Sequence, residues 1–498
     1  MSYYLILDIG TTIVKAFAYS PDGNILKRIE RRAPILFPEP GYVEQDPEKL
    51  WEMVQDVSLE IFNEFGKPLA VGITNQRAST IVWDKRSGES LYNMITWQDM
   101  RAADIAREYN RKASLRLARG IGKLVSLFIK RSKSKRLVYL LTLADFKFGP
   151  NQPIIHLRWL FDNIEDIYKK AAKGELAFGT IDSWIIWKMT GKHVTDYTNA
   201  SATGIFDPFF MKWSDRLTKM LGIPKSILPE LIDNMGFLGE VRFLDNAPLT
   251  AVIADQQASL FSAGGLKEGT VKMTNGTGTF IDINVGSIPQ PARFGTYPLV
   301  ALKVGEVVRY LLEGIVQSTG SAVEWLVSIG IIKNPEEASS LAYESESEDI
   351  IFIPSLAGLG TPYWDPEAKG LIYGITRGSK REDIVKGLLD GIAVRCAQVI
   401  NILEDATGIS IEEIIADGNA SRNDYMLQAI ADFSGKKILR VRNLEGTSRG
   451  TFLLTKGGLE KHDIRHVHRQ PVIDKVFTPQ KKRQMTEWQK FIEFVTKK

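Results

Sequence analysis

The chain has 498 residues, of which 44% are hydrophobic and 24% are charged, and its single cysteine is Cys396. These values are typical of a globular protein, with two domains as the simplest arrangement, and they exclude an intrachain disulfide. The net charge of +4 gives no support for a nucleic-acid partner. Because no run of about 20 apolar residues could cross a bilayer, we expect no stable membrane insertion and a cytoplasmic location.

The N-terminal stretch Leu5 to Thr12 is an apolar run that ends in a carboxylate, a glycine and two hydroxyls. It predicts a buried strand reaching Asp8, and residues 13–19 predict a second strand. We expect Gly10 to permit the tight turn between them by adopting a positive φ. Such a turn gathers backbone N–H groups and hydroxyls where phosphate oxygens bind. An ordinary hairpin explains the same pattern, so the rest of the chain has to decide.

The following segments alternate between strand and helix patterns. Residues 47–65 have apolar side chains at helical spacing, and Asp46 is placed to cap that helix. Residues 70–73 and 80–83 predict buried strands. This alternation predicts an α/β domain.

Residues 111–136 contain ten Lys or Arg residues and no acidic residue, with apolar side chains such as Leu117 and Phe128 between them. One interpretation is an amphipathic element that meets an anionic surface or an acidic substrate. The other is a solvated surface excursion with a small packed face, which is the commoner origin of a charge run.

A polar loop is predicted for residues 195–202. The sequence Asn-Ala-Pro at 246–248 resembles a linker, so we predict domains of residues 1–247 and 248–498. The second domain is predicted to open with an apolar strand that leads to Asp255.

Residues 270–285 repeat the N-terminal pattern, because a strand, a Gly/Thr-rich turn at 275–279 and a returning strand follow one another. Farther on, residues 381–406 predict a long helix, and an apolar strand ends in Asp417 and Gly418. The last 20 residues predict an amphipathic helix that packs on the core.

None of the motifs GxxxxGK[ST], GxGxxG, HExxH and CxxC occurs, so P-loop, Rossmann and metalloprotease interpretations have no local support. The chain instead has two glycine–hydroxyl hairpins, and Asp8 and Asp255 stand at strand ends. Phosphoryl transfer needs N–H and OH donors around the phosphates, carboxylates for Mg²⁺ and a base for the incoming hydroxyl. Two facing hairpins could clamp a triphosphate between them.

Eight short segments in this order resemble the actin/Hsp70-like ATPase superfamily and, within it, the FGGY carbohydrate kinases, with glycerol kinases as the nearest match. The segments are 8–12, 72–77, 96–98, 178–184, 195–201, 254–258, 275–280 and 358–366. The resemblance covers almost the whole chain. It implies an α/β fold of two actin-like (ribonuclease H-like) domains with an ATP and substrate cleft between them.

The resemblance also implies ATP-dependent phosphorylation of a hydroxyl of a small polyol or sugar, with glycerol as the first expected substrate. The alternatives are a kinase for a larger polyol or ketose, a non-kinase actin-like ATPase, and a regulatory protein with a decayed site. Both a monomer and a homodimer are compatible with the sequence.

The residue roles that the resemblance implies begin with Asp255 as general base, and with Asp8 and Asp255 beside Mg²⁺. Substrate binding is implied for Arg77, Trp97, Asp255, Gln256 and Phe280. ATP binding is implied for Gly10, Thr11, Thr12, Lys15, Gly276, Thr277, Gly278, Gly320, Gly418, Asn419 and Asn423.

The chain departs from the glycerol kinase pattern at Ala78, where those enzymes have a Glu after the Arg. That Glu accepts a hydrogen bond from a glycerol hydroxyl, and an unpaired hydroxyl in a dry site costs about 1–3 kcal/mol. We therefore expect glycerol to bind weakly, or a larger polyol or sugar to fill the space. Without its adjacent carboxylate, Arg77 would favour an oxygen-rich or anionic substrate.

Overall fold

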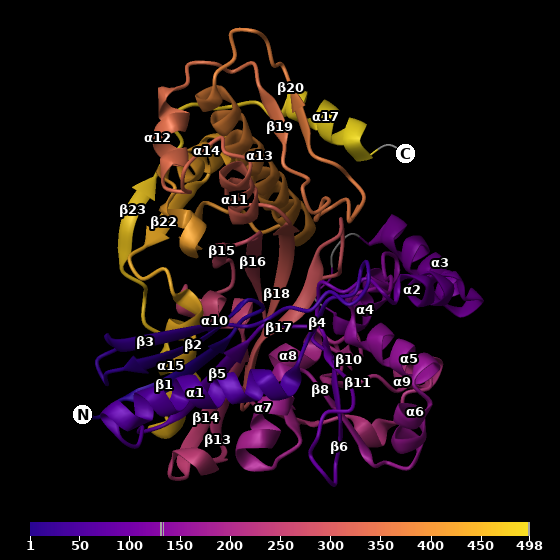
Figure 1. Cartoon of the computed structure of the whole chain (residues 1–498). Coiled ribbons are helices and arrows are strands. Elements are labelled where there is room, and N and C mark those ends of the chain that lie inside the picture. The colour runs from indigo at the N-terminus through magenta and orange to yellow at the C-terminus, as the bar shows by residue number, and fades with distance from the viewer. Residues whose placement is uncertain (130–131, 133, 497–498) are drawn as a thin grey trace.

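The computed structural model describes residues 1–129, 132 and 134–496 and consists of two halves, each built on a mixed β-sheet (Figure 1). The predicted α/β class is confirmed. Of the ten basic residues in 111–136, Lys130, Arg131 and Lys133 lie outside the described residues.

The first sheet has the strand order β13-β14-β5-β1-β2-β3. Its strands are β1 Tyr4–Ile9, β2 Ile13–Tyr19, β3 Ile25–Arg32, β5 Val71–Asn75, β13 Met235–Val241 and β14 Ala247–Ala254. β1 pairs with β2 in antiparallel and with β5 in parallel orientation. All residues of β1 and β5 are buried, which explains the apolar runs at residues 5–7 and 70–73 of the sequence.

The second sheet has the order β17-β18-β16-β15-β21-β22-β23. Its strands are β15 Val271–Asn275, β16 Thr279–Gly286, β17 Tyr297–Val304, β18 Val307–Val316, β21 Glu413–Asp417, β22 Lys437–Val441 and β23 Ile473–Phe477. β15 is antiparallel to β16 and parallel to β21, just as β1 is to β2 and β5. The two sheets therefore repeat one topology, and the two predicted hairpins occupy equivalent places in it.

The chain passes from the first sheet to the second at a different position from the predicted domain boundary after residue 247. β14 starts at Ala247, yet it pairs with β5 inside the first sheet, so the change of sheet falls after Ala254. In addition, α15 (Gly446–Leu459) returns to pack on β1, β5, β13 and β14 of the first half. Strand order within a sheet depends on long-range pairing, which the linker-like sequence at 246–248 does not reveal.

The helices of the first half begin with α1 (Pro47–Phe65), which Asp46 caps by accepting from the N–H groups of Glu48 and Lys49. The others are α2 Ala103–Arg111, α3 Ala113–Phe128, α4 Lys135–Leu143, α5 Pro153–Asn163, α6 Glu165–Ala172, α7 Ile181–Thr190, α8 Tyr197–Ser201 and α9 Asp215–Leu221. Short strands are β4 Glu44–Gln45, β6 Ile81–Asp84, β7 Met94–Ile95, β8 Leu176–Gly179, β9 Val194–Asp196, β10 Phe206–Asp207, β11 Lys212–Trp213 and β12 Glu230–Ile232.

The second half is organised around α13 (Arg381–Thr407), whose buried apolar residues belong to its main hydrophobic core. The others are α10 Asp255–Ser262, α11 Gly320–Ser328, α12 Glu337–Glu344, α14 Asp424–Ser434, α16 Ile464–Val467 and α17 Thr486–Thr496. Two short strands are β19 Ile351–Ile353 and β20 Leu371–Tyr373, and 3₁₀ helices occupy Lys225–Ile227, Arg242–Leu244 and Asn419–Arg422. As predicted, the C-terminal helix buries Trp488 and Ile492 in this core.

One local prediction was wrong. Residues 195–202 form the end of β9 and the helix α8 rather than a polar loop. The side chain of Asp196 accepts from the N–H groups of Thr198 and Asn199 and so starts the helix. Among the described helices, none is long and apolar enough to cross a membrane.

Candidate active site

The turn between β1 and β2 is closed by the N–H of Gly10, which donates to the carbonyl of Ile13 at 3.0 Å. Gly10 does not have the positive φ that we expected. Glycine is favoured here for a different reason, because the Cβ of any other residue would lie only 3.0 Å from the carbonyl oxygen of Ile13. Thr12 is exposed at the bend, so its hydroxyl is accessible to an incoming ligand.

The side chain of Thr11 connects this turn to the neighbouring segments. Its Oγ1 donates to Oε1 of Gln76 at 2.6 Å and accepts from Nε1 of Trp97 at 3.0 Å. Gln45 donates to the Thr11 carbonyl at 2.9 Å and accepts from Gln76 at 3.0 Å. The structure therefore brings Trp97, predicted for the substrate, against Thr11, predicted for ATP.

Asp8 and Lys15 lie beside each other on β1 and β2, with Nζ of Lys15 3.8 Å from Oδ2 of Asp8. The same Nζ lies 3.0 Å from Oε2 of Glu445, which comes from the second half of the chain. Burial raises the pKa of Asp8 to about 6, although Lys15 opposes the rise. Burial disfavours the charge on Lys15, yet Asp8 and Glu445 together raise its pKa. Lys15 thus connects the first hairpin to Glu445, the residue that precedes α15.

The turn between β15 and β16 has a main-chain support. The N–H of Gly276 donates to the carbonyl of Gly278 at 2.9 Å, and Thr277 is exposed at the bend. The N–H of Gly320, at the start of α11, donates to the Gly276 carbonyl at 3.0 Å. A Cβ at Gly278 would lie 2.7 Å from the oxygen of Val316, and one at Gly320 would lie 2.6 Å from that of Gly276. The second turn therefore brings together four residues that were predicted to bind ATP, namely Gly276, Thr277, Gly278 and Gly320.

A charged cluster joins the two halves. Arg77, just after β5, has Nε 3.5 Å from Oδ1 of Asp255 and Nη2 2.6 Å from Oε2 of Glu313. Its guanidinium carbon lies 5.8 Å from the centroid of the Phe280 ring. The structure thus unites Arg77, Asp255 and Phe280, and it adds Glu313, which the sequence analysis missed. A signal existed, because Glu313 is a lone acid within the apolar run of β18.

Asp255 is the first residue of α10, and its Oδ1 accepts from the N–H of Gln256 at 2.7 Å. A quarter of its side chain remains exposed. Burial raises the pKa of Asp255, while the positive charge of Arg77 opposes the rise. Asp255 is also one of the charges that raise the pKa of Asp8, so the two carboxylates act on the same region. A carboxylate with a raised pKa is a stronger base for a hydroxyl proton.

Behind this cluster lies a buried polar network. Nζ of Lys272 donates to Oε1 of Gln256 at 2.6 Å and lies 3.4 Å from Oδ2 of Asp282. Lys272 and Asp282 have no exposed side-chain surface, and burial raises the pKa of Asp282 despite the nearby lysine. The side chain of Gln256, predicted to bind substrate, is thus engaged by Lys272.

The predicted adenosine residues lie at the end of β21. Gly418 has φ of 83°, and its N–H donates to the carbonyl of Leu444 at 3.2 Å. The side chain of Asn419 accepts from Arg422 at 3.0 Å, and that of Asn423 caps α14. The side chains of these two asparagines are therefore already engaged in hydrogen bonds within the protein.

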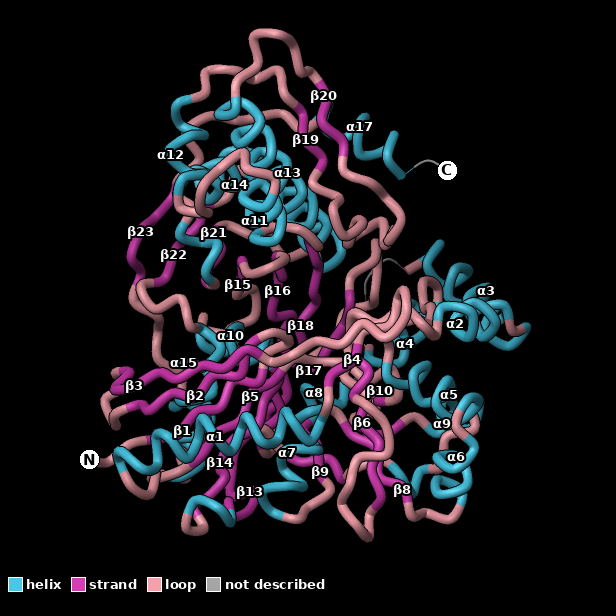
Figure 2. The backbone as a smooth tube through the Cα atoms, in the orientation of Figure 1, coloured by secondary structure: helices cyan, strands magenta, loops and turns pink. Residues whose placement is uncertain are grey.

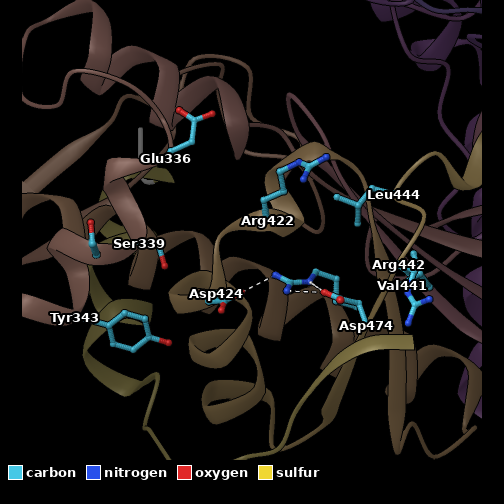
Figure 3. A pocket seen from close by; sticks show the side chains of 11 residues that line it. Glu336, Ser339, Tyr343, Arg422, Asp424, Val441, Arg442, Leu444 and Asp474 are labelled. Carbon is cyan, nitrogen blue, oxygen red and sulfur yellow. Dashed lines mark hydrogen bonds and ion pairs between the residues drawn. The ribbon is translucent and has the colours of Figure 1, made fainter. Parts of the chain in front are cut away.

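A cavity of about 690 Å³ adjoins this segment (Figure 3). It is lined by Glu336, Ser339, Ser340, Tyr343, Arg422, Asp424, Arg440, Val441, Arg442, Leu444 and Asp474. Arg440 is held between Asp424 at 2.6 Å and Asp474 at 2.7 Å, which the dashed lines in Figure 3 mark. The wall therefore combines fixed charges with the aromatic ring and hydroxyls of α12.

Within the described part of the chain, no group of three or more His, Cys, Asp or Glu side chains could hold a metal ion. Asp8 and Asp255 are only two carboxylates. Mg²⁺ commonly uses one or two carboxylates and takes its remaining ligands from water and phosphate. The residues present therefore fit Mg²⁺ that arrives with a nucleotide and do not form a closed protein cage.

Two sheets of one topology, with a glycine–hydroxyl hairpin in each and carboxylates between them, define an actin-like phosphotransfer protein. The model of the N-terminal domain of the FGGY family of carbohydrate kinases matches residues 3–133 and 129–261, and that of the C-terminal domain matches residues 271–456. The chain belongs to the FGGY family of carbohydrate kinases.

Individual relatives agree. An uncharacterized sugar kinase of Archaeoglobus fulgidus is 38% identical over 92% of both chains. A glycerol kinase of Lactobacillus acidophilus is 36% identical over 91% of this chain and 88% of its own. The structure of Plasmodium falciparum glycerol kinase with ADP superposes with a TM-score of 0.86 at 28% identity, covering 100% of this chain and 99% of that one. The expected family, fold and enzyme class, an ATP-dependent kinase of a polyol or sugar, are thus confirmed.

Proposed function

We propose that this kinase binds its acceptor at the cluster of Arg77, Asp255 and Phe280, and that Asp255 takes the proton from the attacking hydroxyl. The observation that carries this proposal is the position of Asp255 at the start of α10, paired with Arg77 and partly exposed. The guanidinium group fixes the carboxylate, and its charge keeps the carboxylate ionised more readily than burial alone would allow.

We propose that ATP lies between the two hairpins, with Thr12 and Thr277 nearest the phosphates because both are exposed at the bends. Gly10, Gly276, Gly278 and Gly320 would let backbone N–H groups approach the phosphate oxygens. Asp8 and Asp255 would hold Mg²⁺, which neutralises phosphate charge when it is bound.

The adenosine is proposed to lie at the cavity beside Gly418. Leu444 lines this cavity and accepts from the N–H of Gly418, and Arg422 and Asp424, the chain neighbours of the predicted Asn423, line it as well. A cytoplasmic location is also proposed, since the buried thiol of Cys396 is compatible with a reducing compartment.

Glycerol is the first candidate acceptor, because several relatives are named glycerol kinases. Ala78 favours a second candidate, a larger polyol or ketose, since alanine provides no acceptor for a glycerol hydroxyl. The hypothesis of an anionic substrate loses its basis, because Glu313 and Asp255 already balance the charge of Arg77.

The test is an ADP-release assay with glycerol, C4–C6 polyols and ketoses. We expect ADP release that depends on an acceptor; failure with every compound would favour a regulatory protein. The variant Ala78→Glu should raise kcat/KM for glycerol about tenfold, as one recovered hydrogen bond allows, and Ala78→Leu, which adds volume without a hydrogen-bond acceptor, serves as a size control. If the wild type turns over glycerol at least as well as every larger compound, the role given to Ala78 is wrong.

A further inference from the structure

The helix α3 has two apolar faces. One is formed by Leu115, Ala118 and Gly122, which are buried. This face packs against α4, where a Cβ at Gly122 would lie 2.4 Å from the backbone nitrogen of Ala144. The contact explains how the helix is attached to the molecule but leaves its other face open.

The other apolar face points to solvent. Leu117, Ile121, Leu124 and Phe128 follow the spacing i, i+4, i+7 and i+11, so they form one row along the helix. Their exposed fractions are 68%, 46%, 59% and 81%. Single exposed apolar residues are common, but a continuous row on one helix marks an interaction surface.

Positive charge flanks this apolar row. Arg116 and Lys123 are seven residues apart, which places them on the neighbouring line of the helix, and both are exposed. Lys135 and Arg136, also exposed, begin α4. Since residues 111–136 contain no acidic residue, the segment offers no negative charge of its own to balance them.

The row is placed where a large partner could reach it. Figures 1 and 2 show α3 at the edge of the molecule, on the side where α2 and α4 gather. The two matches to the N-terminal family model meet at residues 129–133, directly after α3. The helix thus adjoins the point where the family pattern is broken.

We propose that α3 rests on an anionic lipid surface, with the row of Leu117, Ile121, Leu124 and Phe128 in the acyl boundary and the basic flank toward the headgroups. An apolar face bordered by Lys and Arg is the arrangement that binds at such an interface. Nucleic acid would use the positive charge but has no need of four exposed apolar side chains. The helix lies on the membrane and does not cross it, and this property is separate from phosphoryl transfer.

The test uses the full chain and sucrose-loaded vesicles, either of phosphatidylcholine alone or of equal parts phosphatidylcholine and phosphatidylglycerol. We expect co-sedimentation with the anionic vesicles that weakens as salt rises. Absence of binding to the anionic vesicles, or equal binding to both kinds, would overturn the proposal.

Paired variants separate the two components of the surface. Leu124→Gln with Phe128→Gln should weaken vesicle binding at least about tenfold, and Arg116→Gln with Lys123→Gln should weaken it about fivefold per charge removed. The apolar control changes the exposed Phe237 and Phe494 to Gln, and the charge control changes the exposed Arg216 and Lys219 to Gln. Equal losses in the controls would contradict a site on α3.

Circular dichroism and the melting midpoint verify that each variant folds. If the apolar double variant does not fold, Phe128→Ser replaces it, because 81% of this side chain is exposed. Sedimentation velocity without vesicles tests for a second copy as the occupant. Self-association that the apolar variant abolishes, without vesicle binding by the wild type, would assign the row to a dimer and overturn the proposal.

Discussion

The two hairpins occupy equivalent places in the two sheets but are supported differently. In the first, the side chain of Thr11 is held by Gln76 and Trp97. In the second, the carbonyls of Gly276 and Thr277 accept N–H groups from the start of α11. The first hairpin therefore shares its residues with the proposed acceptor side, whereas the second is fixed to a helix.

The difference shows that two hairpins of the same topology can differ in how freely they move. A turn held by side chains can respond to what its neighbours bind, and Trp97 would carry such a response from the acceptor to the phosphates. A turn held by main-chain bonds and close-packed glycines has little freedom to shift. Arg77 and Glu313 connect the two halves across this division.

The largest effect is expected from Arg77→Met, because it leaves Glu313 buried without its cation. We expect the free energy of unfolding to fall by about 3–5 kcal/mol, measured from the melting midpoint and denaturant unfolding. The control is Arg28→Met, since Arg28 is more exposed and pairs with Glu445. Arg28→Met should lower the free energy of unfolding by at most about 1 kcal/mol. An equal loss in both variants would refute a special role for the ion pair of Arg77 and Glu313.

The second prediction concerns the rigidity of the second hairpin. Gly278→Ala places a Cβ 2.7 Å from a carbonyl oxygen, whereas the nearest atom for Gly276→Ala is 3.8 Å away. We expect Gly278→Ala to lower the free energy of unfolding by about 1–3 kcal/mol and to weaken ATP binding in calorimetry, whereas the free energy of unfolding of Gly276→Ala should stay close to that of the wild type. The reverse order would show that the main-chain support is misassigned.

The third prediction tests the buried Asp282 on β16, behind the second hairpin. Its raised pKa means that the folded state keeps a proton that the unfolded chain releases above about pH 4. The stability from this proton is complete below that pH and declines as the pH rises, by at most about 1.4 kcal/mol per unit. Asp282→Asn should flatten the dependence of the melting midpoint on pH, and the exposed control Asp56→Asn should not. A slope unchanged in Asp282→Asn would contradict the assignment.

The smallest effect separates the two hairpins directly. Trp97→Phe removes the 3.0 Å bond to Thr11, and Ser321→Ala removes a 3.0 Å bond to the Thr277 carbonyl. Each bond contributes about 0.5–1.5 kcal/mol. Steady-state kinetics should show higher KM for both acceptor and ATP in Trp97→Phe, but for ATP alone in Ser321→Ala. Identical profiles would remove the distinction between the hairpins.

The parts of the site that could be predicted from sequence are those encoded by neighbouring residues. Both hairpins and the strand that leads to Asp255 are local patterns, and the order of short segments identified the family. We expected a tight turn at Gly10, and the structure has one. The expected reason was wrong, because glycine is favoured there by the short distance that a Cβ would have to the Ile13 oxygen and not by a positive φ.

The parts that could not be predicted depend on register and long-range contact. Glu313 reaches Arg77 only because β18 and β5 belong to facing halves, and Glu445 reaches Lys15 only because α15 packs back on the first sheet. For the same reason the linker-like residues 246–248 did not reveal that β14 completes the first sheet. Sequence spacing carries no record of such contacts.

Asp255 is the proposed base at the junction of the two halves. The most direct test is the rate of Asp255→Asn with the best acceptor found in the ADP-release assay, together with calorimetry of ATP binding. We expect kcat to fall by about 10²–10⁴-fold, while the melting midpoint and, in buffer without Mg²⁺, the affinity for ATP stay close to those of the wild type. Full activity in Asp255→Asn would contradict it.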